Sequence, residues 1–574
     1  MKKNFRTISL VALSTLTVAT LLGLQKDDRE FKISKNMDIF FSLYQELQMF
    51  YVDEPDPDKI IPAAIDEMLS KLDPYTTYIP ENDKEAYNFQ ISGEYGGVGS
   101  VISVSDTNLI QVKEIYQGTP SDKAGLHVGD YFLRIDGEEM RGKAVADVSS
   151  KLRGKAGEVV KVEVQRLGEP KPVKIDIKRE VIKLDAIDYY GMLSDGIGYI
   201  SLRGFETNCA EELQKAFIDL RDNHGAKKLI LDLRNNPGGL LDEALKIVNF
   251  FVPEGSNMLS TRGRLKTMDR NYKALQKPID TTMPIAVMIN RSSASASEIV
   301  SGAMQDLDRA VVVGQRSFGK GLVQATRDIA FDGLLKVTTS KYYTPSGRCI
   351  QALDYTNKDE NGAVGYVADS LLKELKTKGG RKVFDGGGIS PDVLLDGMKY
   401  KPVTISLIAG DYPFRYFMSL QAQGKKPAFT AEEKLTDEGY QDFINFMKKQ
   451  KKFNYKTRTQ ELCTKLISTA KAEGLYDNAK QEIYELEKKV TAELERDMLA
   501  ASGEVRQFVE AEAIRSTQYR KKSIAHSLQY DNQIKQTIEL LKDDARYHGL
   551  LDGTIESHAG DKPRADKEKE KENY

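Results

Sequence analysis

Residues 286–324 of this 574-residue chain read AVMINRSSASASEIVSGAMQDLDRAVVVGQRSFGKGLVQ. An apolar run at 287–290 predicts the end of a buried strand, and small residues follow it at 292–297. Helical spacing is shown by the next apolar residues, Ile299, Val300, Ala303 and Met304. A second apolar run at 310–313 predicts a return strand, and the loop after it carries Lys320 between two glycines. The stretch therefore predicts a strand, a helix and a second strand.

This pattern can bring a serine and a lysine together. A helix of about 11 residues carries the chain roughly 17 Å from the serines, and a strand of about five residues returns it by roughly 16 Å. Lys320 can therefore return beside the start of the helix, where Ser295 lies. A serine at a helix N-terminus has backbone N–H groups and the positive end of the dipole nearby. A desolvated lysine can act as a base, so the two residues form a candidate Ser-Lys pair.

Other interpretations of these residues remain open. Ser295 and Glu298 have the spacing of a capping box, so Ser295 could serve only as a helix cap. Lys320 could be a solvated loop residue. Residues 314–320 also match the phosphate-binding P-loop pattern up to its lysine. Gly321 stands where that loop needs Ser or Thr for magnesium, and the residues that follow favour a strand over a helix, so nucleotide binding is disfavoured.

Three short motifs resemble one family of peptidases. They are SASASEI at 293–299, GAMQD at 302–306 and FGKGLVQ at 318–324. Their combination is similar to the C-terminal processing peptidases, also called tail-specific proteases. The resemblance implies that Ser295 is the nucleophile, Lys320 the general base and Gln324 the residue that orients the lysine. The family's serine and lysine are separated by 25 positions, as Ser295 and Lys320 are. The resemblance also selects Ser295 among the neighbouring serines, which the residues alone do not.

Bulk composition narrows the class of protein further. A chain of 574 residues is long enough for three or four domains. Its formal net charge of −2 gives no reason to expect nucleic acid as the main partner. The three cysteines are widely spaced and provide neither a disulfide framework nor metal-ligand spacing. A Ser-His-Asp triad would need distant residues such as His224, and the resemblance implies a reaction that needs no metal or cofactor.

Residues 1–30 have the layout of an export signal. Lys2, Lys3 and Arg6 precede an uncharged, mostly apolar run at 7–25. The run is just long enough to span a bilayer, and no Ala-x-Ala site follows it. A cleaved signal peptide and an uncleaved membrane anchor are therefore both open. Residues 31–90 then predict a helical segment, which suits packing or formation of a homo-oligomer.

Residues 91–182 resemble a PDZ domain, a β-rich α+β module. A glycine-rich loop at 93–99 precedes an apolar alternation. The PDZ pattern continues with TPS at 119–121, AGL at 124–126, GD at 129–130 and IDG at 135–137. Backbone N–H groups in such a loop suit a terminal carboxylate. We therefore expect a substrate C-terminus to bind at Gly96, Gly97, Val98 and Gly99, with the peptide added as an edge strand. A PDZ fold kept only as a scaffold is the alternative.

Residues 183–395 are expected to form the catalytic core. The apolar run at 229–233 predicts a buried strand, and RNNPGG follows it at 234–239. This loop resembles the family's second motif, which supplies a backbone N–H to the oxyanion hole. The resemblance implies Gly238 and Gly239 as the candidates, with the N–H of Ala296 as their partner. Glycine lets backbone donors approach a developing oxyanion closely. An ordinary strand-to-helix turn is the alternative.

The resemblance fades beyond residue 395. Residues 396–559 carry helical apolar stripes and predict a helical extension. The last stretch, 560–574, is charged and predicts a disordered tail.

The expected fold is an α/β multidomain protein with a crotonase-like α/β protease core, a PDZ domain and helical N- and C-terminal segments. The resemblance implies an exported serine endopeptidase, in the bacterial periplasm or tethered to the inner membrane. It would recognise protein or peptide substrates by their free C-termini through the PDZ domain and cut near them. Two other classes remain open: a catalytically silent PDZ adaptor, and a crotonase-like acyl-CoA enzyme. The second would need an adenine-nucleotide site, and an exported location supplies no coenzyme A.

Overall fold

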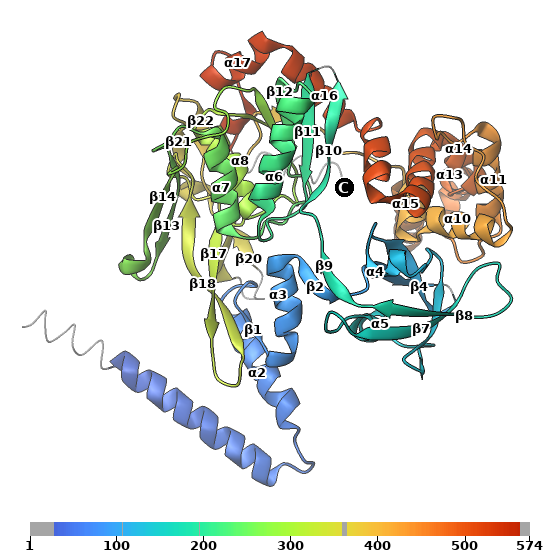
Figure 1. Cartoon of the computed structure of the whole chain (residues 1–574), viewed down its shortest axis with the longest axis horizontal. Helices are drawn as coiled ribbons and strands as arrows, with labels where there is room; N and C mark the ends of the chain where they lie inside the picture. Colours follow the sequence, from blue (N-terminus) through green and yellow to red (C-terminus); the bar gives the residue numbers. More distant parts are fainter. Residues whose placement is uncertain (1–27, 106, 195, 359–363, 563–574) are drawn as a thin grey trace, which may run out of the picture. The chain divides into compact units, whose positions relative to one another are not determined.

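The computed structural model describes residues 28–105, 107–194, 196–358 and 364–562, which belong to two compact units, Met1–Tyr78 and Ile79–Tyr574 (Figure 1). The first unit contains a helix at residues 28–50 and α2 (Pro57–Ser70). Among the described residues, no helix is both long and apolar enough to cross a membrane. The apolar run expected at 7–25 and most of the predicted tail lie outside the described residues.

An antiparallel sheet of six strands lies near the start of the second unit in the sequence. Its strands are β3 (Ser100–Val104), β4 (Ile110–Ile115), β5 (Tyr131–Ile135), β6 (Glu138–Glu139), β7 (Val159–Gln165) and β8 (Val173–Lys178). Alternate residues of β7, namely Val160, Val162 and Val164, point into a core that α5 (Val145–Leu152) covers. Strand β3 lies at one end of the strand order, so one of its edges faces away from the sheet.

The glycine-rich stretch before this sheet is only partly a loop. Gly96 and Gly97 belong to β2 (Glu94–Gly97), which pairs antiparallel with β9 (Glu180–Lys183). The prediction of one loop over 93–99 is therefore wrong, because the two glycines take part in a strand pair. A Cβ atom on Gly96 would lie 2.1 Å from the carbonyl oxygen of Gly154, so glycine permits a close backbone approach here.

The catalytic core expected at 183–395 contains a six-stranded sheet in the order β10-β11-β12-β15-β16-β23. The strands are β10 (Ile187–Ser194), β11 (Ile197–Leu202), β12 (Lys228–Asp232), β15 (Ile285–Ile289), β16 (Val311–Gly314) and β23 (Val393–Leu394). The five strands β11, β12, β15, β16 and β23 run parallel to one another, and β10 is antiparallel to β11. The strands expected around 287–290 and 310–313 are confirmed as β15 and β16.

Helices cover both faces of this sheet, because alternate residues of its strands are apolar on both sides. Leu229 and Leu231 of β12 pack with α6 (Cys209–Ile218), α7 (Leu241–Phe251) and α8 (Ala296–Asp306). Ile230, between them, faces the opposite cluster. That cluster includes α16 (Asn532–Lys542) and α17 (Asp544–Asp552), which lie over the core sheet in Figure 1. The α/β architecture is confirmed, and helices from the far end of the chain complete it.

A second, smaller sheet flanks the core. It contains β13 (Asn257–Gly263), β14 (Arg270–Lys273), β17 (Leu322–Asp328) and β18 (Leu334–Tyr343). Strand β17 directly follows the loop that carries Lys320, where a P-loop would continue as a helix. The nucleotide-binding alternative is thus contradicted by the fold.

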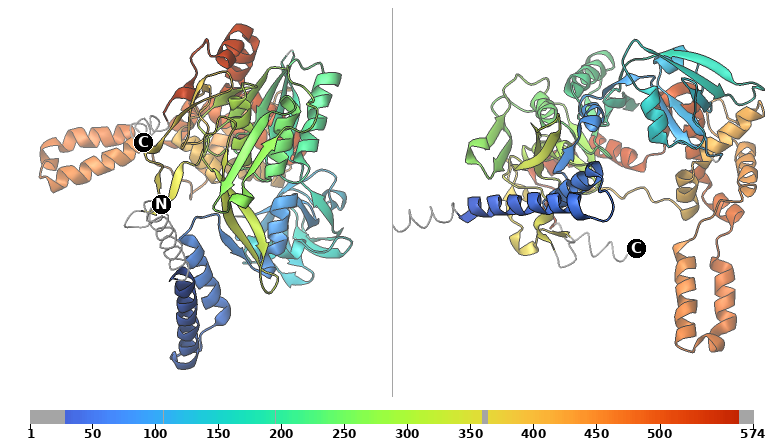
Figure 2. Two further views of the ribbon diagram at one scale, coloured as in Figure 1. Left: turned by 90° about the vertical axis from the view of Figure 1, so that its left-hand side faces the viewer. Right: turned by 90° about the horizontal axis from the view of Figure 1, so that it is seen from below.

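Helices form most of the segment after residue 401. Besides α16 and α17, they are α9 (Pro402–Ala409), α10 (Tyr412–Ala422), α11 (Asp437–Lys448), α12 (Arg458–Ala472), α13 (Lys480–Val490), α14 (Leu494–Ala500) and α15 (Ser502–Leu528). Most of them share one apolar core around Phe443 and Val505. Helices α12 and α13 lie side by side as a hairpin (Figure 2).

Candidate active site

Ser295 occupies the turn between β15 and α8. It is the N-cap residue of α8, and its backbone has φ 54° and ψ −111°. Positive φ is uncommon for a residue with a side chain, and such strain gathers at functional sites. The flanking residues Ala294 and Ala296 are buried, whereas Ser295 keeps partial exposure. The turn therefore leaves Ser295 partly exposed between two buried alanines.

The neighbouring serines have other tasks. The hydroxyl of Ser293 donates to the carbonyl oxygen of Leu233 at 2.7 Å, and that of Ser297 donates to the carbonyl oxygen of Asn236 at 2.9 Å. Both side chains are fully buried. They tie the turn to the loop after β12, so the geometry itself separates Ser295 from them.

Glu298 joins the serine turn to the lysine loop. Its Oε2 accepts hydrogen bonds from the amides of Ser295 at 2.8 Å and Lys320 at 2.9 Å. Its Oε1 accepts from the hydroxyl of Ser317 at 2.5 Å and the amide of Gly319 at 2.6 Å. One carboxylate thus fixes the backbone of both predicted catalytic residues.

Burial decides the protonation of Glu298. Its side chain is fully buried, and burial raises its pKa from 4.5 to about 6, although the donors from Ser317, Lys320, Gly319 and Ser295 oppose the rise. The sequence indicated only a capping box here. The spacing of Ser295 and Glu298 was the available signal, and it gave no sign that the same carboxylate also holds the lysine loop.

Tyr342 of β18 makes a second link between the two segments. Its hydroxyl donates to the carbonyl oxygen of Ser295 at 3.2 Å and also contacts the carbonyl oxygen of Lys320. The phenol ring is buried. Ser295 and Lys320 are therefore held side by side through their backbones from two directions.

Gln324, the predicted orienting residue, lies on β17. It pairs in register with Thr338 of β18, and its side-chain amide donates to the Thr338 hydroxyl at 3.3 Å. The side chain is partly buried. The structure thus positions Gln324 on the strand that leads away from Lys320, four residues after it.

Gly238 of the loop after β12 lies against the serine turn. It has φ +102°, and a Cβ atom here would lie 2.8 Å from the Cβ of Ser295 and 2.9 Å from the amide nitrogen of Ala296. Any side chain would therefore block the approach to the Ala296 N–H. Because Ala296 is the first residue of α8, its amide is one of those that the helix itself leaves unpaired.

The amide of Gly238 is already engaged in this structure. It donates to Oδ1 of Asn236 at 2.9 Å, and the Asn236 side-chain amide donates to the carbonyl oxygen of Leu202 at 2.8 Å. Asn236 is fully buried. The amide of Gly238 can therefore donate to an oxyanion only after it gives up its hydrogen bond to Asn236. The amides of Gly239 and Ala296 do not depend on that exchange.

The predicted carboxylate loop of the PDZ module is supported from behind. Val98 and Gly99 form the turn between β2 and β3. The carbonyl oxygen of Val98 accepts from the amide of Ser121 at 2.8 Å, and that of Gly99 accepts from the Thr119 hydroxyl at 3.1 Å. Both carbonyls therefore point inward, toward the residues that open α4 (Pro120–Lys123).

Three histidines pair with carboxylates away from this site. His224, His526 and His558 contact Asp219, Glu510 and Asp561, none of which belongs to the serine turn or the lysine loop. Within the described ranges, no group of three or more His, Cys, Asp or Glu side chains is arranged to hold a metal ion.

Comparisons with known proteins agree with this arrangement. Residues 196–358 match the model of peptidase family S41, and residues 111–166 match that of the PDZ domain. Residues 403–541 match the C-terminal helical domain of a probable PDZ-protease. The PDZ prediction is confirmed in kind, while the domain boundaries stay predictions.

Similar whole proteins carry matching names. A carboxy-terminal-processing protease of Bartonella bacilliformis is 38% identical over 325 residues, which cover 56% of this chain and 74% of that protein. A probable CtpA-like serine protease of Staphylococcus aureus is 32% identical over 418 residues, with coverages of 70% and 75%. Among solved structures, the photosystem II D1 C-terminal processing protease is 27% identical and covers 62% of this chain and 86% of its own, with a TM-score of 0.34.

Proposed function

The chain belongs to the carboxy-terminal-processing serine proteases, and from this premise we propose that Ser295 is its nucleophile and Lys320 its general base. The family acts on proteins or peptides near their C-termini. The observation that carries the proposal is the Glu298 carboxylate, which accepts from the amides of both residues.

The proposed reaction divides hydrolysis into two acyl-transfer steps. Neutral Lys320 takes the hydroxyl proton of Ser295 while the serine oxygen attacks the scissile carbonyl. The lysine then gives that proton to the departing amine, and an ester on Ser295 remains. A water molecule, deprotonated by Lys320, attacks the ester and releases the new C-terminus, and Lys320 returns that proton to the departing Ser295 oxygen. Gln324 is assigned the task of orienting the lysine.

The developing oxyanion needs backbone donors. We assign this role to the amides of Ala296, Gly239 and Gly238. Ala296 is favoured by its place at the start of α8, with the helix dipole behind it. Gly238 can join once its amide leaves Asn236. Substrate binding is the natural occasion for this exchange.

The PDZ module is proposed to bind the substrate's free C-terminus. The carboxylate is assigned to the turn at Val98 and Gly99, next to the end of β2 at Gly96 and Gly97. Strand β3 supports this role, because it ends the strand order and can accept a peptide as an added strand.

The proposal also covers the fold type of the core, the location of the protein and its oligomer formation. The core is assigned to the crotonase-like kind, which is supported by the parallel strands β12 and β15: the loop after β12 lies against the turn after β15, which carries Ser295. The protein is proposed to be exported to the periplasm, with residues 1–30 as signal peptide or inner-membrane tether. Oligomer formation is assigned to the helical segments.

A tailed substrate tests the proposal. The full chain is incubated with a denatured protein that ends in an unstructured tail, and the products are read by mass spectrometry. We expect cuts near the C-terminus by the wild-type enzyme and none by Ser295→Ala or Lys320→Ala. Because the pair acts as a unit, the double variant should lose no more than either single one. Full turnover by either single variant would contradict the pair.

A further inference from the structure

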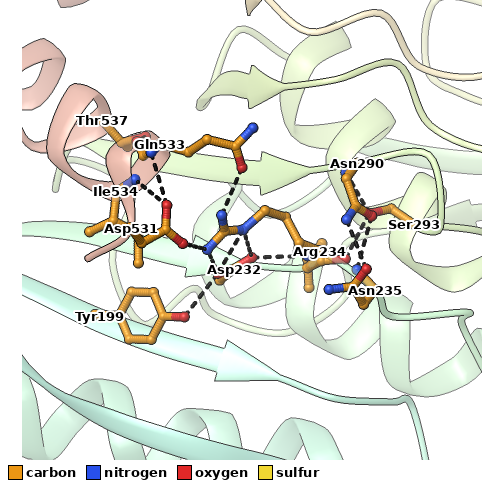
Figure 3. A network of polar contacts seen from close by, with 11 residues as sticks. Tyr199, Asp232, Arg234, Asn235, Asn290, Ser293, Asp531, Gln533, Ile534 and Thr537 are labelled. Atoms are coloured by element: carbon orange, nitrogen blue, oxygen red, sulfur yellow. Dashed lines mark hydrogen bonds and ion pairs between the residues drawn. The ribbon is translucent and has the colours of Figure 1, made fainter. Parts of the chain in front are cut away.

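A buried polar cluster joins the C-terminal segment to the loop after β12 (Figure 3). At its centre lies Arg234, two residues before Asn236 and four before Gly238. Its side chain is 12% exposed, and those of Asp232 and Asp531 are 6% and 9% exposed. A nearly buried guanidinium of this kind persists only where its charge and its donors are matched.

The guanidinium is shared between the core and the C-terminal segment. Its Nε and Nη2 donate to the carboxylate of Asp232, at 3.0 Å and 2.6 Å. Nη2 also forms an ion pair with Asp531 at 2.8 Å, and Nη1 donates to Oε1 of Gln533 at 2.7 Å. In Figure 3 these groups converge on Arg234 from opposite sides. The core thus supplies one partner, and the C-terminal segment supplies two.

The two C-terminal residues are themselves fixed. Asp531 is the N-cap of α16, and its Oδ1 accepts from the amides of Gln533 at 2.9 Å and Ile534 at 3.1 Å. The side-chain amide of Gln533 donates to the carbonyl oxygen of Asp396 at 3.0 Å. Apolar residues of α16, such as Leu541, are buried on the core sheet. Both side chains therefore reach Arg234 from a rigid base.

Charge favours this arrangement over an isolated arginine. Burial alone would lower the pKa of Arg234, but the carboxylates of Asp232 and Asp531 outweigh it and raise that pKa. The guanidinium accordingly keeps its charge and its planar set of donors, which suits contacts in several directions. Removing one carboxylate would leave the cation only partly matched.

Hydrogen bonds continue from Arg234 to the serine turn. The amide of Asn235 donates to Oδ1 of Asn290 at 3.0 Å, and the Asn290 side-chain amide returns a bond to Oδ1 of Asn235 at 2.9 Å. The carbonyl oxygen of Asn236 accepts from the amide of Ala294 at 3.1 Å. The loop after β12 is thus tied at one end to the C-terminal segment and along its length to the residues before Ser295.

We propose that Asp531 and Gln533 are positioning residues for the peptidase reaction, which act through Arg234 to hold the oxyanion loop against Ser295. This inference rests on the proposed roles of Ser295, Gly238 and Gly239. It gives the end of the helical extension a task in catalysis, although Asp531 and Gln533 lie 297 and 299 positions from Arg234 in the sequence.

The test compares two N-cap aspartates in the full-length chain. Asp531→Asn keeps a side chain that caps helices well but removes the charge that faces Arg234. Asp543→Asn is the matched control, because exposed Asp543 caps α17 through the amide of Arg546. With a quenched-fluorescence peptide that the wild-type enzyme cuts, we expect Asp531→Asn to lower kcat about tenfold with KM changed less than about twofold. Asp543→Asn should match the wild type in both constants.

Two further variants keep the outcome decisive. Arg234→Gln should also lower kcat, and adding Asp531→Asn to it should lower kcat no further, because Asp531 acts through Arg234. Gln533→Ala, which leaves the cap intact, provides the same comparison if Asp531→Asn does not fold. The inference would be overturned if Asp531→Asn and Gln533→Ala both kept the wild-type kcat. It would also be overturned if Asp531→Asn lowered kcat by the same factor in the Arg234→Gln enzyme as in the wild-type enzyme. Ser295→Ala in the same assay separates the two levels: if it is active, the proposed function fails instead.

Discussion

Two buried charges hold the two halves of the proposed active site, and they are stabilised in opposite ways. Glu298 is an anion surrounded by neutral donors, two of them the amides of Ser295 and Lys320. Arg234 is a cation between two carboxylates, those of Asp232 and Asp531. Glu298 accepts from backbone amides, whereas the Arg234 guanidinium contacts side chains beside the loop after β12.

The difference lies in how each charge responds to pH. Burial raises the pKa of Glu298 to about 6, and its hydrogen-bond donors offset only part of that rise. An arginine cannot be deprotonated in a protein, and its carboxylate neighbours hold the Arg234 pKa higher still. The lysine loop should therefore be sensitive to mild acid through Glu298, while the oxyanion loop should keep its central charge.

The largest effect is expected from Glu298→Gln. A glutamine would turn N–H groups toward amides that now donate to the carboxylate, and buried donors would lose their partner at about 1–3 kcal/mol each. We expect kcat to fall by about a hundredfold or more, since both Ser295 and Lys320 would shift. Peptide hydrolysis by purified protein measures it.

Glu211→Gln serves as the control for that substitution. Glu211 lies exposed on α6 and pairs with Lys215 at 2.9 Å. Its replacement should leave hydrolysis unchanged. If the Glu298→Gln enzyme is as active as this control, Glu298 does not hold Ser295 and Lys320 in place for the reaction.

Next in size is the pH dependence of stability. Because the folded-state pKa of Glu298 is about 6 against an ordinary 4.5, the unfolded chain releases this proton first. The free energy of unfolding should therefore fall by about 2 kcal/mol as pH rises from below 4.5 to above 6. Urea unfolding of the wild type and of Glu298→Gln, at about pH 4 and about pH 7, isolates this group as a difference.

If the unfolding free energies of the wild type and Glu298→Gln differ by the same amount at both pH values, the pKa of Glu298 is not raised in the folded protein. Arg234 gives no such change, because it is charged throughout.

Arg234→Lys should have an intermediate effect. Lysine keeps the positive charge but cannot form the planar contacts to Asp232, Asp531 and Gln533 together. We expect kcat to fall about tenfold while the pH at which Glu298 ionises stays the same. A shift of that pH in the urea unfolding series would mean that Glu298 and Arg234 are coupled and that the comparison between them is too simple.

The smallest expected effect comes from Ser317→Ala. The Ser317 hydroxyl donates to Oε1 of Glu298 at 2.5 Å and accepts from the amide of Ile389 at 2.6 Å. Its loss removes one donor that lowers the Glu298 pKa, so the pH at which Glu298 ionises in the folded protein should rise. At neutral pH we expect kcat to fall only about two- to fivefold, because three donors to the carboxylate remain. Urea unfolding at several pH values follows this ionisation, and a shift to lower pH would contradict the role of this donor.

Much of the candidate site could be predicted from local sequence. Ser295 and Lys320 could be paired because a strand, a helix and a return strand have known lengths, and the structure has those elements as β15, α8 and β16. Glu298 was visible only as a cap, since spacing says nothing about a carboxylate's second partner. The loop expected over 93–99 became half a strand, because pairing with β9 is a contact across more than eighty residues.

The Arg234 cluster lay beyond sequence reasoning for a related reason. Asp531 reads as an ordinary N-cap, and nothing in its neighbourhood indicates a partner 297 positions earlier. Only the packing of α16 on the core sheet brings the two together. Long-range pairs of buried charge need a fold before they can be recognised.

The central claim is that neutral Lys320 serves as the base for Ser295, and its most direct test replaces that amine. Lys320→Cys should be inactive, and alkylation with bromoethylamine rebuilds a lysine-like side chain whose sulfur atom lowers the pKa of its amine. Cys209 and Cys463 are buried, and Cys349 is partly exposed, so alkylated wild-type enzyme is the control. We predict that activity returns and that the acid limb of the pH–rate profile moves to lower pH. Wild-type activity in untreated Lys320→Cys, or restored activity with an unmoved limb, would contradict the claim.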